Sequence, residues 1–280
     1  MSVESWVELA AKELSVDGLE LYWGFLDPEE KALKRLRREI EAHDLCVPMM
    51  CHSPDFTQPD PRKRAEEIER QRRAIIGSAL LGTRYCRVLS GQRRPEVDRH
   101  DGIAMAAECI AGLLPFAQEH GVCLILENHY KDGFWRYPEF AQRMDVFLEL
   151  LAAIPTSPAF GVNYDPSNAL IAGDDPLALL NAVKDRVVTM HASDRYFEGG
   201  SAAELRLLEC DPSLGYAPFL RHGIIGQGCI DYAGIFSVLR SVGFRGWISI
   251  EDGDDPTVGI EHLQESVRFL RNRMSDFGLP

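Results

Sequence analysis

Residues 122–127 read Val-Cys-Leu-Ile-Leu-Glu, a short apolar run that ends on the carboxylate of Glu127. Three later segments have the same form, and each of these runs, rich in β-branched residues, ends on Asp165, His191 or Glu251. Short runs of this kind predict buried strands. A parallel α/β barrel gathers the carboxyl ends of its strands on one face, so we expect these four side chains to meet although they are far apart in sequence.

The rest of the chain alternates helical and extended patterns. Further strands are expected at 18–23, 45–50 and 84–89, with amphipathic helices between them. Alternation of this kind predicts a TIM (β/α)8-type barrel in a single domain over residues 1–280. The tally is about seven strands, one short of the eight of a full barrel, because the chain opens on a helix where a first strand is expected. Either the first strand is missing and the barrel is open there, or the recorded start lies downstream of the true one.

The four strand ends offer three carboxylates and one imidazole. This mixed oxygen and nitrogen set suits Mn²⁺, Mg²⁺, Co²⁺ or Zn²⁺, and it contains none of the thiolates of structural zinc sites. Single residues have ordinary alternatives: Glu127 as a solvated strand terminus, Asp165 as a helix cap or turn residue, and His191 as a buried core histidine. Because four strands end on a ligand type together, we interpret them as one divalent-metal site.

Other polar residues near these strand ends are candidates for substrate contact. Strand alternation points His129 to the same side as Glu127, where it can contact substrate or support a ligand. Asn168 follows the second of the four strand ends closely enough to offer a polar contact. His52 follows an earlier strand and can face the pocket, although a loop histidine without a role explains it equally well.

Arg195 comes four residues after His191, and we interpret it as the anchor for a substrate hydroxyl, carboxylate or phosphate group. A surface ion pair with Asp194 is the alternative. The segment 226–231, Gly-Gln-Gly-Cys-Ile-Asp, places two glycines before an expected helix start, which is a weak signal for a phosphate-binding loop. Loop flexibility and a helix cap by Asp231 explain it equally well.

The composition bounds the class of protein. A formal net charge of −13 argues against a nucleic-acid partner, because affinity for nucleic acid comes largely from neutralising phosphates. No apolar run is long enough to span a bilayer, and the N-terminus lacks the pattern of a secretory signal. The seven cysteines show no disulfide framework, so we expect reduced thiols and a cytoplasmic location.

Taken together, these segments resemble the xylose isomerase-like superfamily of TIM barrels, which contains sugar isomerases and epimerases. The similarity extends from Gly18 over nearly the whole chain. Its most specific motifs are Leu-Glu-Asn-His at 126–129, Tyr-Asp-Pro-Ser-Asn at 164–168, Met-His-Ala-Ser-Asp-Arg at 190–195, Gly-Gln-Gly-Cys-Ile-Asp at 226–231 and Ile-Glu at 250–251. The resemblance implies that Glu127, Asp165, His191 and Glu251 bind one divalent ion, with Mn²⁺ as the first expectation. It also implies that the two glutamates exchange the proton of the reacting carbon.

The chain departs from the family pattern in three places. Many epimerases of the family have a histidine three residues after the aspartate, where this chain has Asn168. Arg195 follows the histidine ligand after a shortened segment. Residues 196–225 form a long insert with Arg221 and His222 near its end, and we include His222 among the expected substrate contacts. These departures leave the substrate and the reaction type open.

We therefore expect a divalent-metal-dependent isomerase or epimerase of a small sugar or keto-sugar, working by proton transfer through a metal-bound enediolate with Glu127 and Glu251 as the catalytic pair. The alternative is a metal-dependent lyase or decarboxylase of a 3-oxo sugar or sugar acid. An endonuclease IV-like DNA repair enzyme is disfavoured, because it needs many histidine ligands and a basic groove. A non-catalytic sugar-binding barrel is disfavoured by the intact ligand positions. No nucleic acid or membrane partner is expected, and a homo-oligomer is compatible with the sequence.

Overall fold

The computed structural model describes residues 1–205, 216–251 and 259–279. Contacts divide the chain into two compact units. Unit 1 comprises Met1–Gly91, Pro95–Leu126 and Leu150–Gly161, and unit 2 comprises Gln92–Arg94, Glu127–Glu149 and Val162–Pro280.

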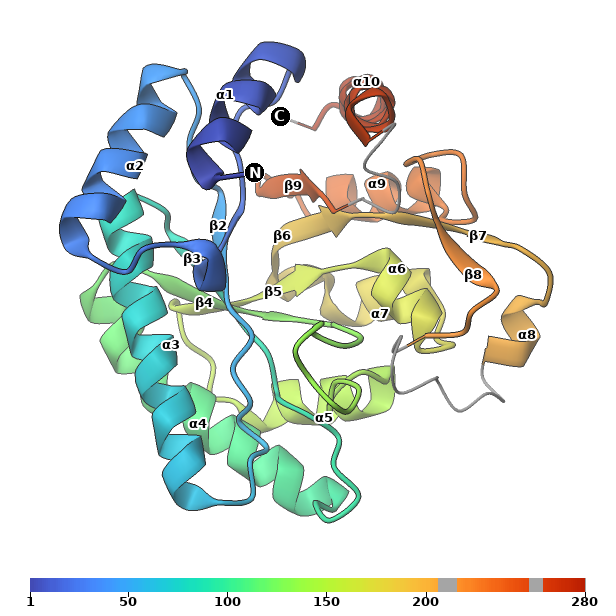
Figure 1. The fold of residues 1–280 in the computed structure, drawn as a ribbon. Coiled ribbons are helices and arrows are strands. Elements are labelled where there is room, and N and C mark those ends of the chain that lie inside the picture. The colour runs from blue at the N-terminus through green and yellow to red at the C-terminus, as the bar shows by residue number, and fades with distance from the viewer. Residues whose placement is uncertain (206–215, 252–258, 280) are drawn as a thin grey trace. The chain divides into compact units, whose positions relative to one another are not determined.

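Seven strands in the described residues form a parallel sheet whose order follows the sequence (Figure 1). In sheet order they are β1 (Leu21–Tyr22), β2 (Met49–Cys51), β3 (Tyr85–Val88), β4 (Cys123–Glu127), β5 (Phe160–Tyr164), β6 (Val187–Ala192) and β9 (Trp247–Ile250). Sequential parallel strands separated by helices are what successive βα units produce. The predicted parallel α/β fold is therefore confirmed, and residues 1–20, all of which are described, contain no strand of this sheet before β1.

Unit 1 contains four long helices, whose ends follow local sequence signals. They are α1 (Val3–Glu13), α2 (Glu30–Ala42), α3 (Pro61–Leu81) and α4 (Arg99–Glu119). The side chain of Asp60 accepts a hydrogen bond from the Arg62 backbone N–H at the start of α3, and Pro61 occupies the first turn, where no N–H partner is needed. Gly82 ends α3 with a φ of 80°, a left-handed conformation that suits glycine.

Unit 2 contains further helices beside β5, β6 and β9. They are α6 (Pro166–Ile171), α7 (Pro176–Val183), α9 (Tyr232–Ser241) and α10 (Gly259–Phe277), while α5 (Met144–Ala153) contains residues of both units. Asp165 caps α6 and Asp175 caps α7, and in each helix a proline follows the cap in the first turn. The chain therefore leaves β5 directly into a helix, which fixes the direction of the residues at the end of the strand.

The described ends of the predicted insert at 196–225 belong to a second, antiparallel pair of strands within unit 2. Strands β7 (Asp194–Phe197) and β8 (Leu220–Gly223) are paired, and a short helix α8 (Ala202–Leu205) lies between them in sequence (Figure 1). The hairpin has its own apolar core, in which Leu205 and Leu220 are buried together with Ile171 of α6. This packing holds the hairpin against α6, the helix that Asp165 caps.

In the part of the chain that the structure describes, no helix is both long enough and apolar enough to cross a membrane. The six described cysteines are all free, as expected. Burial raises the pKa of the Cys86 thiol to about 12, so this side chain is a neutral core residue.

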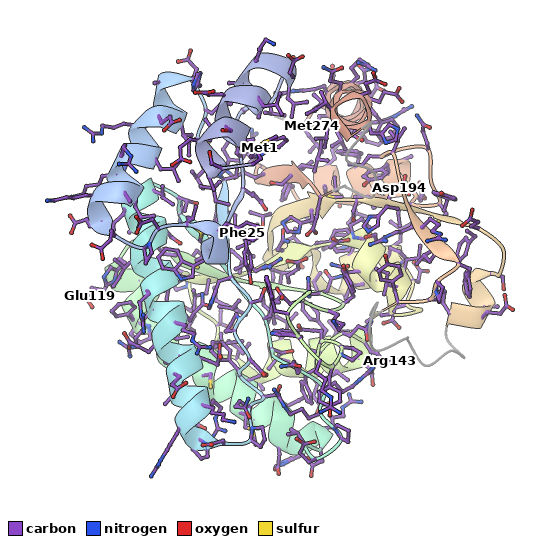
Figure 2. All side chains as sticks on the ribbon, viewed as in Figure 1. Met1, Phe25, Glu119, Arg143, Asp194 and Met274 are labelled. Carbon is purple, nitrogen blue, oxygen red and sulfur yellow. The ribbon has the colours of Figure 1, made fainter. Side chains whose placement is uncertain are left out.

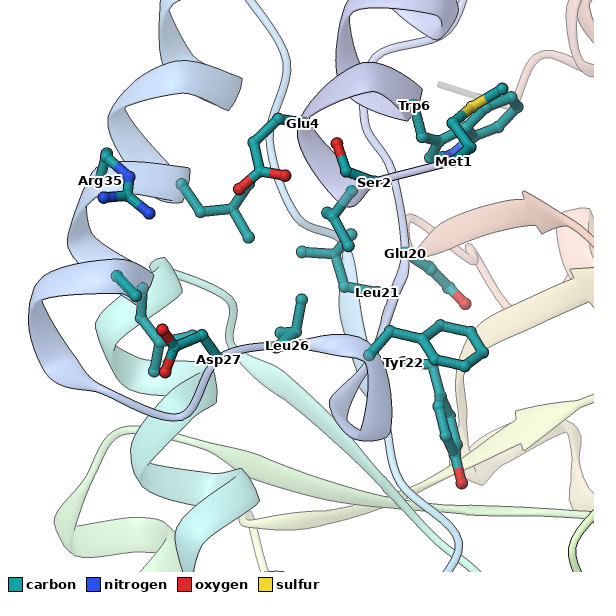
Figure 3. Close-up of a pocket in the computed structure, with 15 residues that line it drawn as sticks. Met1, Ser2, Glu4, Trp6, Glu20, Leu21, Tyr22, Leu26, Asp27 and Arg35 are labelled. Carbon is teal, nitrogen blue, oxygen red and sulfur yellow. The ribbon is translucent and has the colours of Figure 1, made fainter.

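A cavity of about 760 Å³ opens in unit 1, at the start of α1 and beside α2 (Figure 3). Its lining is largely apolar and includes Trp6, Leu21 and Leu36. Phe25, labelled in Figure 2, also lines the cavity and is 70% exposed. None of the four strand-end side chains is among the lining residues, so this cavity is a separate feature from the site described next.

Candidate metal centre

Four strand ends of unit 2 bring their polar side chains to one point. Glu127 is the last residue of β4, Asp165 follows β5, His191 lies in β6 and Glu251 follows β9. One ligand atom from each of the four lies within 4.8 Å of the others. Strand β6 pairs in parallel with β9, and the Glu251 backbone N–H donates to the carbonyl of Ala192 at 2.9 Å, which fixes the relative height of these two ligands.

His191 stands between the two glutamates. Its Nδ1 lies 3.3 Å from Oε1 of Glu127 and 3.0 Å from Oε2 of Glu251. The side chains of His191 and Glu127 are buried, whereas that of Glu251 is 51% exposed. One imidazole nitrogen facing two carboxylates requires a proton or a cation to balance their charge.

Asp165 combines two roles in the structure. Its Oδ1 accepts hydrogen bonds from the backbone N–H groups of Ser167 and Asn168, at 2.7 and 3.0 Å, and from the hydroxyl of Ser193 at 2.9 Å. The helix-cap alternative is therefore correct, and the same residue also belongs to the four-residue cluster. Burial above all, and then the negative charges of Glu251 and Glu127, raise the pKa of Asp165 to about 7.

The side-chain amide of Asn128 forms two hydrogen bonds that join the end of β4 to the end of β5. The side-chain NH₂ of Asn128 donates to the carbonyl of Asp165 at 2.6 Å, and its side-chain oxygen accepts from the Asp165 N–H at 2.9 Å. Asn168 closes the arrangement from α6, because its side-chain NH₂ donates to Oε1 of Glu127 at 3.2 Å. Asn168 thus orients a glutamate of the cluster, and its contact with substrate stays a prediction.

Several residues that support the cluster were missed in the sequence. Ser193 donates to Asp165 and lies 2.6 Å from the hydroxyl of Ser167, and its backbone carbonyl accepts from the hydroxyl of Tyr232 at 2.9 Å. Asn128 was passed over because alternation points it away from Glu127. The position of Asn128 could have indicated its role, since a side-chain amide directly after a strand can form hydrogen bonds with the backbone of the neighbouring strand.

The interpretation of residues 226–231 as a phosphate-binding loop is wrong. The carboxylate of Asp194, labelled in Figure 2, accepts from the backbone N–H groups of Gly226, Gly228 and Ile230 at 2.9, 3.0 and 3.1 Å. These donors face a carboxylate of the protein and are not available to a phosphate. Asp231 caps α9 by accepting from the N–H of Gly234, so the helix-cap alternative is correct.

Asp194 and Arg195 do not form the surface ion pair considered above. Both residues are buried, at 1% and 2% exposure, and the Asp194 carboxylate is used by backbone N–H groups, including that of Arg195 itself at 2.8 Å. Gly228 is required at this turn, because a Cβ there would collide with the Asp194 carboxylate and the Arg195 carbonyl. Asp194 forms no ion pair with Arg195 because its carboxylate accepts the backbone hydrogen bonds of a tight turn.

The other expected substrate contacts fall in two places. His129 and His222 lie in unit 2: His129 stacks on Tyr130 with ring centroids 5.1 Å apart, and His222 on β8 pairs with Arg195 on β7. His52 lies in unit 1, where its Nδ1 is 2.7 Å from the side-chain oxygen of Gln71. A contact between His52 and substrate therefore stays a prediction.

The four-residue cluster fits a divalent cation. Three carboxylates and a neutral imidazole are ligands of Mn²⁺, Mg²⁺, Co²⁺ and Zn²⁺, and the recorded separation of the ligand atoms allows all four to reach one ion. Burial first, and then the charges of Glu251 and Glu127, raise the pKa of Asp165, and a cation bound between these carboxylates would favour its ionised form.

Comparison with known proteins identifies the family. The family model described as xylose isomerase-like TIM barrel matches residues 9–273. The chain belongs to this family and has the TIM-barrel fold, as the resemblance implied. The inosose dehydratase of Geobacillus kaustophilus is a curated relative, 30% identical over 159 residues, which make up 56% of this chain and 46% of the relative. The chain spans about half the length of the curated relatives it matches.

Solved structures show the same fold at low identity. A structure of L-ribulose 3-epimerase has a TM-score of 0.76 and 19% identity, covering 99% of this chain and 91% of the other. The structure of the IOLI protein with a bound zinc atom has a TM-score of 0.74 and 16% identity, covering 99% of this chain and 93% of the other. Proteins that share this fold thus include one with a bound zinc atom and others with different named reactions.

Proposed function

We propose that this protein is a divalent-metal-dependent isomerase or epimerase of a small sugar or keto-sugar. The observation that carries the proposal is the pair of glutamates beside His191 Nδ1, with Glu127 at 3.3 Å and Glu251 at 3.0 Å. Carboxylates from two different strands that reach one atom can also reach a small substrate from two sides. Such an arrangement allows one carboxylate to remove a proton from a carbon atom and the other to return a proton to it.

Glu127, Asp165, His191 and Glu251 would hold the ion, with Mn²⁺ as the first metal to test and Zn²⁺, Mg²⁺ and Co²⁺ as alternatives. When bound, the ion supplies Lewis-acid polarisation of the substrate carbonyl and stabilises the negative charge that develops on its oxygen. The zinc in the IOLI structure supports a divalent metal in this fold.

The two glutamates have different tasks in this proposal. One carboxylate accepts the proton of the carbon next to the carbonyl, and the electron pair of the broken C–H bond moves into the carbonyl group. Epimerisation needs a proton delivered to the opposite face of that carbon, so it uses the second carboxylate in its protonated form. Asn168 holds Glu127 in place, and the burial of Glu127 excludes water from its side of the reacting carbon.

Solvent deuterium exchange tests this function. Metal-loaded protein is incubated in D₂O with a panel of ketoses and keto-sugars, and products are analysed by NMR and mass spectrometry. We expect deuterium at the carbon next to the carbonyl of the true substrate, and loss of this exchange after chelation. Conversion of a sugar by the metal-loaded protein without deuterium at either reacting carbon would contradict a proton transfer through solvent-exchangeable carboxylates.

A second candidate is a lyase that eliminates water from a keto-sugar, because the curated relatives are named inosose dehydratase. It begins with the same proton removal, but the electron pair then expels a hydroxyl group as water. The product contains a carbon–carbon double bond conjugated with the carbonyl, so a new ultraviolet absorbance distinguishes this reaction from epimerisation. A decarboxylase would instead release CO₂, which can be trapped.

A further inference from the structure

Arg195 is a buried cation with unused hydrogen-bonding capacity. Its side chain is 2% exposed and is the largest of the fully buried side chains in the described residues. Within those residues, its Nε and Nη1 atoms are buried without a hydrogen-bond partner. Burying a charged group without a partner is strongly unfavourable, so such a residue in a folded protein indicates a partner that arrives later.

The backbone fixes Arg195 from several sides. It pairs with His222 in the β7–β8 hairpin, its carbonyl accepts from the Cys229 N–H at 2.8 Å, and its own N–H donates to Asp194. Asp194 is the nearest acid in sequence, but its two oxygens already accept four backbone N–H groups. The guanidinium is therefore positioned by the fold without an ion pair to Asp194.

Aromatic rings define one face of the guanidinium. Its central carbon lies 4.9 Å from the centroid of the Tyr216 ring, a cation–π contact that covers the face and leaves the edge N–H groups for hydrogen bonds. Tyr216 in turn packs edge-on against Tyr130 at 5.6 Å between centroids, and both belong to the apolar cluster of the hairpin. Tyr216 and Tyr130 thus form an aromatic wall on one side of the arginine.

This wall adjoins the candidate metal centre. Burial raises the pKa of Tyr130 to about 12, while Arg195 lowers it and the carboxylates of Glu251 and Asp165 raise it further. Ser193, two residues before Arg195, donates to the Asp165 carboxylate at 2.9 Å, and Tyr130 follows the candidate ligand Glu127 by three residues. Arg195 and the four candidate ligands therefore lie on neighbouring segments of unit 2.

The single positive charge of the Arg195 guanidinium favours some substrate groups over others. A carboxylate has a single negative charge and two oxygens that match the planar fork of arginine. A phosphate ester has a charge of about −1.5 to −2 at neutral pH, and the excess would lie close to three further carboxylates. Neutral hydroxyls would accept from single N–H groups but would not form the charge-assisted, bidentate contact that a carboxylate forms.

We propose that Arg195 binds a carboxylate of the substrate, so that the substrate is a keto-sugar acid in which this carboxylate is remote from the reacting carbon. That the reacting portion of the substrate is a keto-sugar rests on the proposed function. Of the three substrate groups first considered for Arg195, namely a hydroxyl, a carboxylate or a phosphate, the proposal keeps the carboxylate.

Calorimetric binding of unreactive probes tests this assignment separately from catalysis. D-Gluconate is the carboxylate probe, D-gluconamide its neutral counterpart and D-sorbitol 6-phosphate the phosphate probe, each titrated into metal-loaded and chelated protein. We expect gluconate to bind best in both forms and to lose about 10- to 100-fold in affinity in Arg195→Gln, because a charge-assisted bidentate contact is removed. Arg195→Lys should recover only part of this affinity.

Arg221→Gln is the matched control. Arg221 lies on the paired strand β8 and carries the same charge, but it is exposed and pairs with Glu198 at 2.8 Å. Its loss should leave gluconate affinity unchanged. Equal gluconate affinity in Arg195→Gln and the parent, equal binding of gluconamide, preference for the phosphate probe, or no gluconate binding to the parent would each overturn the proposal.

Thermal unfolding without ligand gives a second measurement that does not depend on the probe. Arg195→Met keeps an unbranched stem against Tyr216 and removes the buried charge. If the cation awaits a ligand, this variant is at least as thermally stable as the parent. A marked loss of stability would show that the guanidinium already has a structural partner, and it would overturn the proposal. Gluconate binding through Arg195 without deuterium exchange into any keto-sugar acid would leave this proposal intact and contradict the proposed function.

Discussion

Glu127 and Glu251 share His191 as a neighbour but differ in access to solvent. The Glu127 side chain is fully buried and receives a hydrogen bond from Asn168, whereas half of the Glu251 side chain is exposed. Proton exchange with water is therefore faster at Glu251. We expect a proton on Glu127 to exchange with solvent more slowly than a proton on Glu251.

Replacing either glutamate with glutamine tests this division at the residue scale. Glu127→Gln and Glu251→Gln each keep one ligand oxygen but remove the basic carboxylate, and each should lower turnover by a factor on the order of 10²–10⁴. Glu198→Gln, on the exposed part of the β7–β8 hairpin, is the control and should be neutral. If both variants keep their metal and exchange deuterium at the parent rate, neither glutamate is the base.

The sequence was informative about residues wherever a strand pattern ended on a ligand type. An apolar run that ends on a polar residue is a local pattern, so Glu127, Asp165, His191 and Glu251 could be selected without the structure. Asn128, Ser193 and the acceptor role of Asp194 depend on partners 28 to 37 residues away. No local pattern encodes such a partner.

At the scale of elements, the turn after β8 depends on one carboxylate. Asp194 accepts from the N–H groups of Gly226, Gly228 and Ile230, so it joins the start of β7 to the segment before α9. A glycine-rich stretch before a helix resembles an anion-binding loop in sequence. In the fold the anion is supplied by the protein, which local composition cannot distinguish from a ligand.

Asp194→Asn should destabilise the protein. The amide NH₂ replaces one acceptor oxygen and faces backbone donors, and each buried donor left without a partner costs about 1–3 kcal/mol. We expect a loss of roughly 2–4 kcal/mol in the free energy of unfolding, measured by urea denaturation. Asp231→Asn is the matched control, because asparagine caps a helix as well as aspartate does. Equal stabilities of the two variants would show that the Asp194 turn contributes little.

For the whole molecule, alternating helices and strands predicted the parallel sheet and its order, because each βα unit is specified locally. The insert at 196–225 was recognised only by its length, and its hairpin was not predicted. Tyr196 and Phe197 lie in β7 while the paired residues of β8 begin at Leu220, so this pairing is non-local. The hairpin is also the part that brings Tyr216 and His222 to Arg195.

The stability of the metal-free protein should depend on pH through Asp165. Its folded-state pKa is raised from 3.8 to about 7, so its contribution is fully present below pH 3.8 and is lost as pH rises through 7. Relative to Asp165→Asn, the parent should therefore become less stable between about pH 4 and 7, by up to about 1.4 kcal/mol per pH unit. Thermal unfolding of both proteins across this range measures the difference. Parallel stability curves would show that Asp165 titrates normally.

Stabilisation by added Mn²⁺ should show the opposite pH dependence. Protons and metal compete for Asp165 and His191, so the rise in melting temperature on adding Mn²⁺ grows as pH increases from 5 to 7. A rise in melting temperature of the same size at every pH would indicate an ion bound elsewhere.

The central claim is that Glu127, Asp165, His191 and Glu251 together bind one divalent ion. Its direct test is titration of chelated protein with Mn²⁺, with free Mn²⁺ measured by electron paramagnetic resonance. Asp165→Asn keeps the cap of α6 but loses a ligand charge, and Asp98→Asn alters the exposed cluster of Asp98, His100 and Asp101 as a control. We predict one tight site per chain in the parent and in Asp98→Asn. In Asp165→Asn we predict a loss beyond the roughly 10- to 100-fold that removal of an outer-shell partner costs. Equal Mn²⁺ binding by the parent and Asp165→Asn, or no tight site in the parent, would contradict the account.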